Sequence, residues 1–421
     1  MKKSALLLAA LALAVTATPA LARTPEQVAE AALREAPVWD RHNDVPIQLR
    51  GRFANMMAIS FHDTSDTSGD GGSWRGRTMR TDIARLRVGR VGAQFWSVYV
   101  SAALTEPEAV QATIEQVDVT KRLIAQNPRD LELALTAADV ERAMKRGRIA
   151  SLMGIEGGHS IGSSLAVLRQ MHDLGVRYMT LTHSKNTPWA DSADDVPMHG
   201  GLSEFGQQVV REMNRIGMIV DLSHVNAEAM NAALDIARAG DLAIRARSRS
   251  TEIRAMCATT CWRGSRVNGG IVMAIAYPAF VSEELRVWLA NRKAEEARLG
   301  WLCSRGSRKR CRPGWISGTR PTPCPRDGGA DGHSYRPYPA RSRSSTASAS
   351  AATMAAWPQV SRYGRRHRLS CAFSAGTGAA WPLRRADLKK IANVNMMQIM
   401  KAVRLTHGLA GAIPPIETPV P

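Results

Sequence analysis

Three side chains that can bind a metal ion lie at matching places in the middle of the sequence. Glu156, His183 and His224 each come directly after a short apolar stretch or within a few residues of one. His42 and Asp44, nearer the N-terminus, lie two residues apart. Imidazole nitrogens and carboxylate oxygens are ligands of catalytic zinc, which takes three protein ligands and keeps one position for water or substrate. The five residues therefore indicate a catalytic metal site.

The pair His42 and Asp44 can bind one cation only if the backbone turns both side chains to the same side. Residues two apart on a strand point in the same direction, so we expect this pair to lie on an extended segment. A His-x-Asp pair alone is more typical of a surface turn. Its combination with Glu156, His183 and His224 favours the metal site.

The segment before Glu156 has the signals of a helix followed by a buried strand. Thr136 and Asp139 are spaced as a capping box, and Gly147 stands where a left-handed residue would end the helix. Residues 149–155 are almost entirely apolar and lead directly into Glu156. We therefore expect the carboxylate at the carboxyl end of a core strand.

The segments before His183 and His224 repeat this order. We expect Ser163 and Ser203 to cap two further helices, and Gly175 and Gly217 to end them. Strands that alternate with helices of this length form a parallel sheet, and polar ligands at the carboxyl ends of its strands are typical of a TIM (β/α)8 barrel. The alternative is an open doubly wound sheet whose strand ends are polar by chance.

Five ordered motifs carry a family resemblance. They are residues 42–44, 92–99, 155–159, 181–191 and 221–224, which read HND, GAQFWSVY, IEGGH, LTHSKNTPWAD and DLSH. Together they resemble the membrane (renal-type) dipeptidases, peptidase family M19. The resemblance runs from residue 37 to 239 and resumes over 267–299 and 386–403. We interpret the aromatic residues of the second motif as core packing.

The resemblance implies a TIM barrel of the metallo-dependent hydrolase type, with two Zn2+ ions that hydrolyse dipeptides through a metal-bound hydroxide. His42 and Asp44 would bind one ion, His224 would bind the other, and Glu156 would bridge both. His183 would orient the substrate or the tetrahedral intermediate. The resemblance also implies a homodimer, and a dipeptide as the partner molecule.

The N-terminus has the features of a secretory signal. Lys2 and Lys3 precede an apolar stretch over residues 5–15, and an Ala-x-Ala cleavage site ends at Ala22. The stretch is too short to span a bilayer. We therefore expect a signal peptide over residues 1–22, a dipeptidase barrel domain over residues 23–411, and a periplasmic or envelope-associated protein without a transmembrane span.

Two blocks, residues 241–266 and 300–385, interrupt the pattern. They are rich in Arg, Ser and Pro, and they contain all six cysteines. Their formal charges of +4 and +14 account for nearly all of the net charge of +19. High net charge often indicates nucleic-acid binding, but here it does not belong to the barrel domain, so we expect no nucleic-acid partner. No spacing among the cysteines matches a zinc motif.

The basic blocks stand where the family would supply a second zinc histidine and a catalytic aspartate. A shifted reading frame of residues 258–265 permits an ordinary amphipathic stretch, and one of residues 334–339 permits His-Ile-Asp-His-Ile. A shifted frame of residues 347–353 permits Gly-Leu-Gly-Gly-Asp, which resembles the family's approach to its aspartate. We therefore interpret the blocks as products of compensating frameshifts, which leave Glu156 and His224 as the ligands of the second ion and put activity in question. The alternative is a genuine disordered insertion in a catalytically inactive, partly folded exported protein whose basic segments bind polyanions. Another barrel amidohydrolase is a third possibility, which the position of Glu156 disfavours.

Overall fold

The computed structural model describes residues 25–57, 59–67, 78–237, 242–245, 269–274, 287–288, 290–292, 294–295, 384–410 and 414–417. The expected signal peptide and nearly all of the two basic blocks lie outside these residues. Their interpretation therefore stays a prediction.

The described strands form one parallel sheet. Its order is β1-β2-β4-β5-β6-β7-β8, and β3 pairs with the first half of β4. Within the described residues, no pairing joins β8 to β1. The strands are β1 Val38–Asn43, β2 Val91–Ser97, β3 Leu131–Leu133, β4 Ile149–Glu156, β5 Val176–Thr180, β6 Ile219–Asp221, β7 Leu242–Arg245 and β8 Ile271–Ala274.

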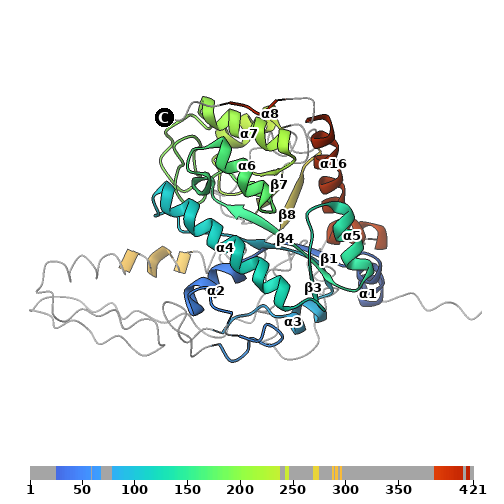
Figure 1. Cartoon of the computed structure of the whole chain (residues 1–421). Coiled ribbons are helices and arrows are strands. Elements are labelled where there is room, and N and C mark those ends of the chain that lie inside the picture. The colour runs from blue at the N-terminus through green and yellow to red at the C-terminus, as the bar shows by residue number, and fades with distance from the viewer. Residues whose placement is uncertain are drawn as a thin grey trace, which may run out of the picture.

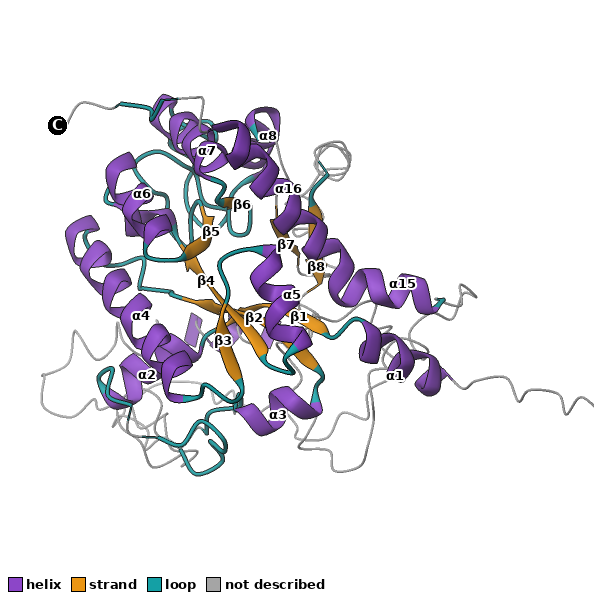
Figure 2. Cartoon of the chain, turned by 45° about the vertical axis from the view of Figure 1, so that its right-hand side comes forward, coloured by secondary structure: helices purple, strands orange, loops and turns teal. Residues whose placement is uncertain are grey.

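Helices follow most of these strands in the chain and lie around the outside of the sheet (Figures 1 and 2). The C-terminal helix α16 returns to lie beside α5, although some 250 residues separate them. The helices are α1 Pro25–Glu35, α2 Val45–Phe53, α3 Ile83–Val88, α4 Glu106–Gln126, α5 Ala137–Lys145, α6 Leu165–Asp173, α7 Glu204–Ile216, α8 Ala227–Ile236, α15 Arg385–Lys389 and α16 Asn395–Ala410, with a short helix η2 Gly158–Ile161 and a π-helical turn η4 Lys390–Val394.

The sheet curls around an interior. Every residue of β2 and of β4 is buried, as expected for strands covered on both faces. Arg41 of β1 forms a buried ion pair with Asp221 of β6, although β2, β4 and β5 separate these strands in the sheet. A flat sheet would hold the two side chains too far apart. The chain thus has the α/β architecture of a TIM barrel, as the sequence predicts.

Most of the predicted helix boundaries are confirmed. Thr136 and Asp139 form the expected capping box, and the Ser203 hydroxyl accepts a hydrogen bond from the Gly206 amide. The expectation that Ser163 caps α6 is wrong, because Ser164 is the cap. Ser163 adopts a left-handed conformation with φ 49°, and its hydroxyl donates to Glu106 at 2.7 Å. The turn that leaves η2 uses Ser163, which moves the cap one residue along.

Candidate metal centre

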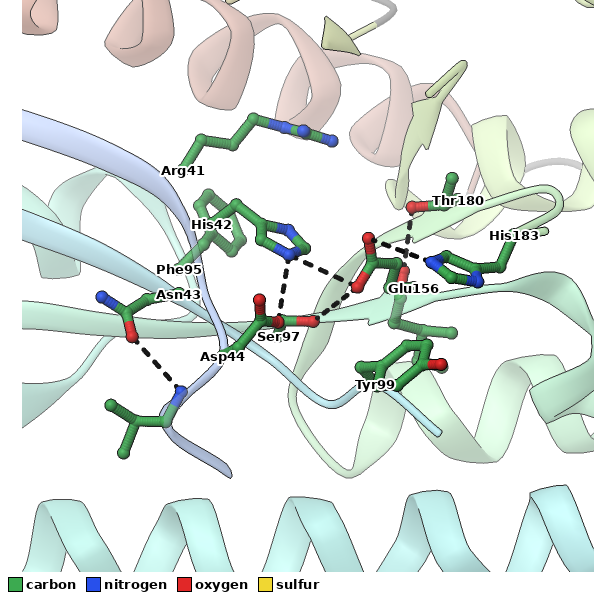
Figure 3. Close-up of polar contacts among 12 residues, drawn as sticks. Arg41, His42, Asn43, Asp44, Phe95, Ser97, Tyr99, Glu156, Thr180 and His183 are labelled. Carbon is green, nitrogen blue, oxygen red and sulfur yellow. Dashed lines mark hydrogen bonds and ion pairs between the residues drawn. The ribbon is translucent and has the colours of Figure 1, made fainter. Parts of the chain in front are cut away.

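Five potential ligands converge at the carboxyl edge of the sheet. Figure 3 labels His42, Asp44, Glu156 and His183 among them. His42 lies near the end of β1, Glu156 is the last residue of β4, and His183 and His224 each come three residues after a strand end. The strands are parallel, so their carboxyl ends meet at one edge. The structure therefore brings together all the site residues that the sequence singles out.

Glu156 is at the centre of the group, and its two carboxylate oxygens face different partners. Oε2 lies 3.3 Å from Nε2 of His42, and Asp44 lies 3.2 Å from the same nitrogen. Oε1 lies 3.3 Å from Nε2 of His224 and 3.9 Å from Nε2 of His183. Figure 3 shows His42 and His183 on opposite sides of the carboxylate. One carboxylate thus joins two groups of three potential ligands, both compact enough for a metal ion.

The donor sets fit divalent metal ions. Two ligand atoms bound to one zinc ion at roughly 2.1 Å can lie no more than about 4.2 Å apart. The distances from the Glu156 oxygens to the three histidines, 3.3 to 3.9 Å, lie within that limit. From the sequence we expected two ligands for the second ion. His183 adds a third potential ligand to that group.

The charges around Glu156 keep its carboxylate ionised. Burial raises the pKa of Glu156, but the positive charge of His42 and hydrogen bonds from His224 and His42 outweigh it and hold the pKa well below its usual value. Burial acts the other way on His183, where it lowers the pKa of the imidazole. The centre without metal therefore combines an ionised carboxylate with a neutral His183 at neutral pH.

Asp44 reaches the centre from a backbone conformation that differs from the extended one we expected. The strand ends at Asn43, and Asp44 is the N-cap residue of α2 with φ −87° and ψ 27°. The prediction that both His42 and Asp44 lie on a strand is therefore wrong for Asp44. The side-chain oxygen of Asn43 accepts the Val45 amide hydrogen bond at 3.2 Å. The Asp44 carboxylate makes no capping hydrogen bond and contacts His42 instead.

The backbone of His224 is in the left-handed region, with φ 64°. Such a conformation is unfavourable for a residue with a side chain, so its surroundings must hold it in place. The His224 carbonyl accepts hydrogen bonds from the Ala193 amide at 2.8 Å and from the hydroxyls of Thr182 at 3.0 Å and Ser192 at 3.3 Å. The Ser192 hydroxyl also lies 2.6 Å from the His183 carbonyl. Ser192 thus links the backbones of both histidines.

Two tyrosines contact potential ligands, and neither contact is predicted from the sequence. The Tyr178 hydroxyl lies 3.2 Å from Nδ1 of His42, and burial raises the pKa of this hydroxyl to about 12, so it stays protonated. The Tyr99 ring contacts the His183 ring with centroids 4.9 Å apart. The interpretation of the aromatic residues after Gly92 as packing is therefore incomplete for Tyr99. The available signal was its position, two residues beyond the end of β2.

Comparisons with known proteins agree with the fold and the motifs. A sequence model described as membrane dipeptidase (peptidase family M19) matches residues 26–297. The chain is 41% identical over 215 residues to Dipeptidase 3 of Rattus norvegicus, and the aligned segment covers 50% of this chain and 41% of that protein. It is 39% identical over 275 residues to an uncharacterized dipeptidase of Schizosaccharomyces pombe, and the aligned segment covers 62% of this chain and 64% of the relative.

A crystal structure of the probable dipeptidase PvdM from Pseudomonas aeruginosa has a similar fold. Its TM-score is 0.52 at 19% identity, over 62% of this chain and 64% of that one. At this identity the likeness concerns the fold alone. The chain spans less than two thirds of the length of each of these three proteins.

Proposed function

Because the chain belongs to the membrane dipeptidase family, peptidase family M19, we propose that it is a metallodipeptidase that uses two zinc ions to hydrolyse dipeptides. One observation carries this proposal. The two oxygens of the buried Glu156 carboxylate face separate groups of imidazole and carboxylate ligands. A carboxylate in that position is suited to bridging two cations.

The proposed ligands of the first ion are His42, Asp44 and Oε2 of Glu156. Those of the second ion are Oε1 of Glu156 and Nε2 of His224. Nitrogen and carboxylate donors of this kind suit zinc. When bound, two zinc ions would polarise the peptide carbonyl and lower the pKa of a water molecule to roughly 7.

The protein side chains would then hold the metal ions and orient the substrate. Glu156 stays ionised, so both of its oxygens remain available as ligands at neutral pH. His183 lies beside Oε1 of Glu156, and we assign it the role of orienting the substrate. Burial lowers its pKa, which favours a neutral imidazole. A neutral imidazole can donate one hydrogen bond to the substrate or to the tetrahedral intermediate.

We further propose that the protein is exported, with cleavage near Ala22, and that the barrel domain over residues 23–411 acts in the periplasm or at the envelope, as a homodimer. Support for export comes from the charged and apolar pattern of residues 1–22. None of the helices in the described part of the chain is long and apolar enough to cross a membrane.

Zinc counting on the purified full-length chain, combined with a dipeptide hydrolysis assay, tests the proposal. Two zinc ions per chain, turnover of dipeptides, and loss of turnover after chelation that added zinc restores would support the proposal. A chain that holds no zinc, and that binds DNA or lipopolysaccharide in a salt-sensitive manner, would instead support the inactive polyanion-binding alternative. The frameshift interpretation is checked separately by resequencing the codons for residues 239–387.

A further inference from the structure

A tyrosine hydroxyl contacts the ring nitrogen of His42 that faces away from the carboxylates. Nε2 of His42 lies 3.2 Å from Asp44 and 3.3 Å from Glu156, while Nδ1 lies 3.2 Å from the Tyr178 hydroxyl oxygen. His42 is on β1 and Tyr178 on β5, and β2 and β4 separate these strands in the sheet. The contact therefore crosses the interior of the barrel.

The two nitrogens of a metal-binding imidazole have different tasks. The one that binds the metal must offer a lone pair, and the other then carries the hydrogen and needs an acceptor. At His42 the metal-binding nitrogen would be Nε2, because Nε2 faces Asp44 and Glu156. The hydrogen must then be on Nδ1, where the Tyr178 oxygen is in place to accept it.

We infer that Tyr178 is a positioning residue for the first metal ion: its hydroxyl oxygen accepts the Nδ1 hydrogen of His42 and so fixes the tautomer and ring orientation that leave Nε2 free. This inference rests on the proposed function, in which His42 is a ligand. Tyr178 acts through His42 and has no direct contact with the ion in this role.

The surroundings of Tyr178 leave its ring little freedom. It is fully buried, and its ring packs against Phe95 with centroids 5.0 Å apart. Gly154 is the partner of Tyr178 in the pairing of β4 with β5. A Cβ at Gly154 would lie 2.0 Å from the Tyr178 ring, so the ring occupies the space that a side chain there would need. The absence of a side chain at Gly154 thus lets the hydroxyl reach across to His42.

A buried ion pair also contacts the Tyr178 ring. The Arg41 guanidinium lies 4.7 Å from the centre of the Tyr178 ring and pairs with Asp221. Asp221 also accepts hydrogen bonds from the Thr180 hydroxyl at 2.6 Å and the Ser223 hydroxyl at 2.7 Å. A buried ion pair resists separation, because breaking it leaves an uncompensated charge. Arg41 and Asp221 therefore limit the movement of the Tyr178 ring.

The substitution Tyr178→Phe tests this role, because it removes the hydroxyl and keeps the ring. Loss of the partner of a ligand typically weakens metal binding about 10- to 100-fold. We expect a loss of that size at one of the two ions, measured by zinc competition with a coloured chelator. The visible spectrum of the cobalt-substituted protein should change for the same ion. His42→Ala gives the reference for complete loss of this ligand.

Tyr99→Phe is the matched control, since it removes a hydroxyl from the tyrosine that contacts His183. We expect its zinc affinity to equal that of the wild type. The melting temperature of the metal-free protein separates positioning from a general structural role. It should be nearly the same for the wild type and Tyr178→Phe.

The outcomes distinguish the two proposals. A wild-type chain without zinc affinity overturns the metal centre and with it the role of Tyr178. Zinc binding with equal affinity in the wild type and Tyr178→Phe overturns the role of Tyr178 alone. A Tyr178→Phe protein whose metal-free form melts much earlier would assign the hydroxyl to stability and also overturn the positioning role.

Discussion

The two halves of the proposed metal centre are built by different means. On the first side, His42 lies within strand β1, and a side chain across the barrel, Tyr178, contacts its second nitrogen. On the second side, His224 lies beyond its strand in a left-handed conformation, and hydrogen bonds to its backbone carbonyl hold it. The comparison shows that a histidine can be held in place by a contact to its ring or by hydrogen bonds to its backbone. Substitutions should therefore affect the two halves separately, except at the carboxylate they share.

Glu156→Gln should have the largest effect, because it removes the charge that both halves share. We expect zinc content to fall below one ion per chain. Dipeptide turnover should fall by more than about 10³-fold, since metal chemistry contributes several kcal/mol to lowering the barrier. Zinc analysis and the hydrolysis assay measure both. Retention of two ions in this variant would rule out a bridging Glu156.

His183→Ala distinguishes a substrate-orienting histidine from a ligand. If His183 orients the substrate, the variant keeps two zinc ions, while kcat falls about 10²- to 10³-fold, as for loss of one positioned donor in other enzymes. Zinc content and kcat are measured on the same sample. Loss of one ion would instead make His183 a ligand of the second site, as its 3.9 Å distance from Glu156 allows.

Ser192→Ala should weaken only the second half, because the Ser192 hydroxyl contacts the carbonyls of His183 and His224. We expect a loss of about tenfold in the affinity for one ion. Tyr178→Phe is the matched variant on the first side, since the Tyr178 hydroxyl lies 3.2 Å from Nδ1 of His42. Chelator competition on both variants should show losses at different ions. Losses at the same ion would show that the halves are not separate.

The smallest effect should come from the backbone of His224. Alanine and glycine both remove the ligand, but only glycine adopts a φ of 64° without strain. The free energy of unfolding of the metal-free His224→Gly protein should be about 0.5–1 kcal/mol higher than that of His224→Ala. This difference is the relief of backbone strain minus the entropy cost of ordering glycine. Denaturant titration measures this difference. A His224→Gly protein that is less stable than His224→Ala by about 0.5–1 kcal/mol, the entropy cost of glycine alone, would mean that the His224 backbone is not strained.

The sequence predicts the parts of this centre that depend on local order. Glu156, His183 and His224 could be placed because each comes shortly after a strand that an apolar stretch and a preceding glycine reveal. The contact of Tyr178 with His42 could not be predicted, because it joins residues 136 positions apart across the barrel. Such contacts depend on how the sheet curls, which the alternation of apolar residues does not encode.

The backbone conformations at the strand ends could not be predicted from the sequence either. The position of Asp44 depends on which side chain takes the Val45 amide, and Asn43 and Asp44 both have oxygens that can accept it. The cap of α6 depends on a left-handed turn at Ser163, for which two adjacent serines give no sequence signal. In both cases neighbouring residues of similar chemistry compete, and the tertiary structure selects one.

The Tyr178 ring fills the space that a side chain at position 154 would need, and this links the evolution of the two positions. Any residue larger than glycine at position 154 would collide with the tyrosine ring, so that change is tolerated only together with a smaller side chain at position 178. The smaller side chain would also remove the hydroxyl that contacts His42. Aligned relatives should therefore show the two positions changing as a pair, and glycine should be present at the first wherever tyrosine is present at the second.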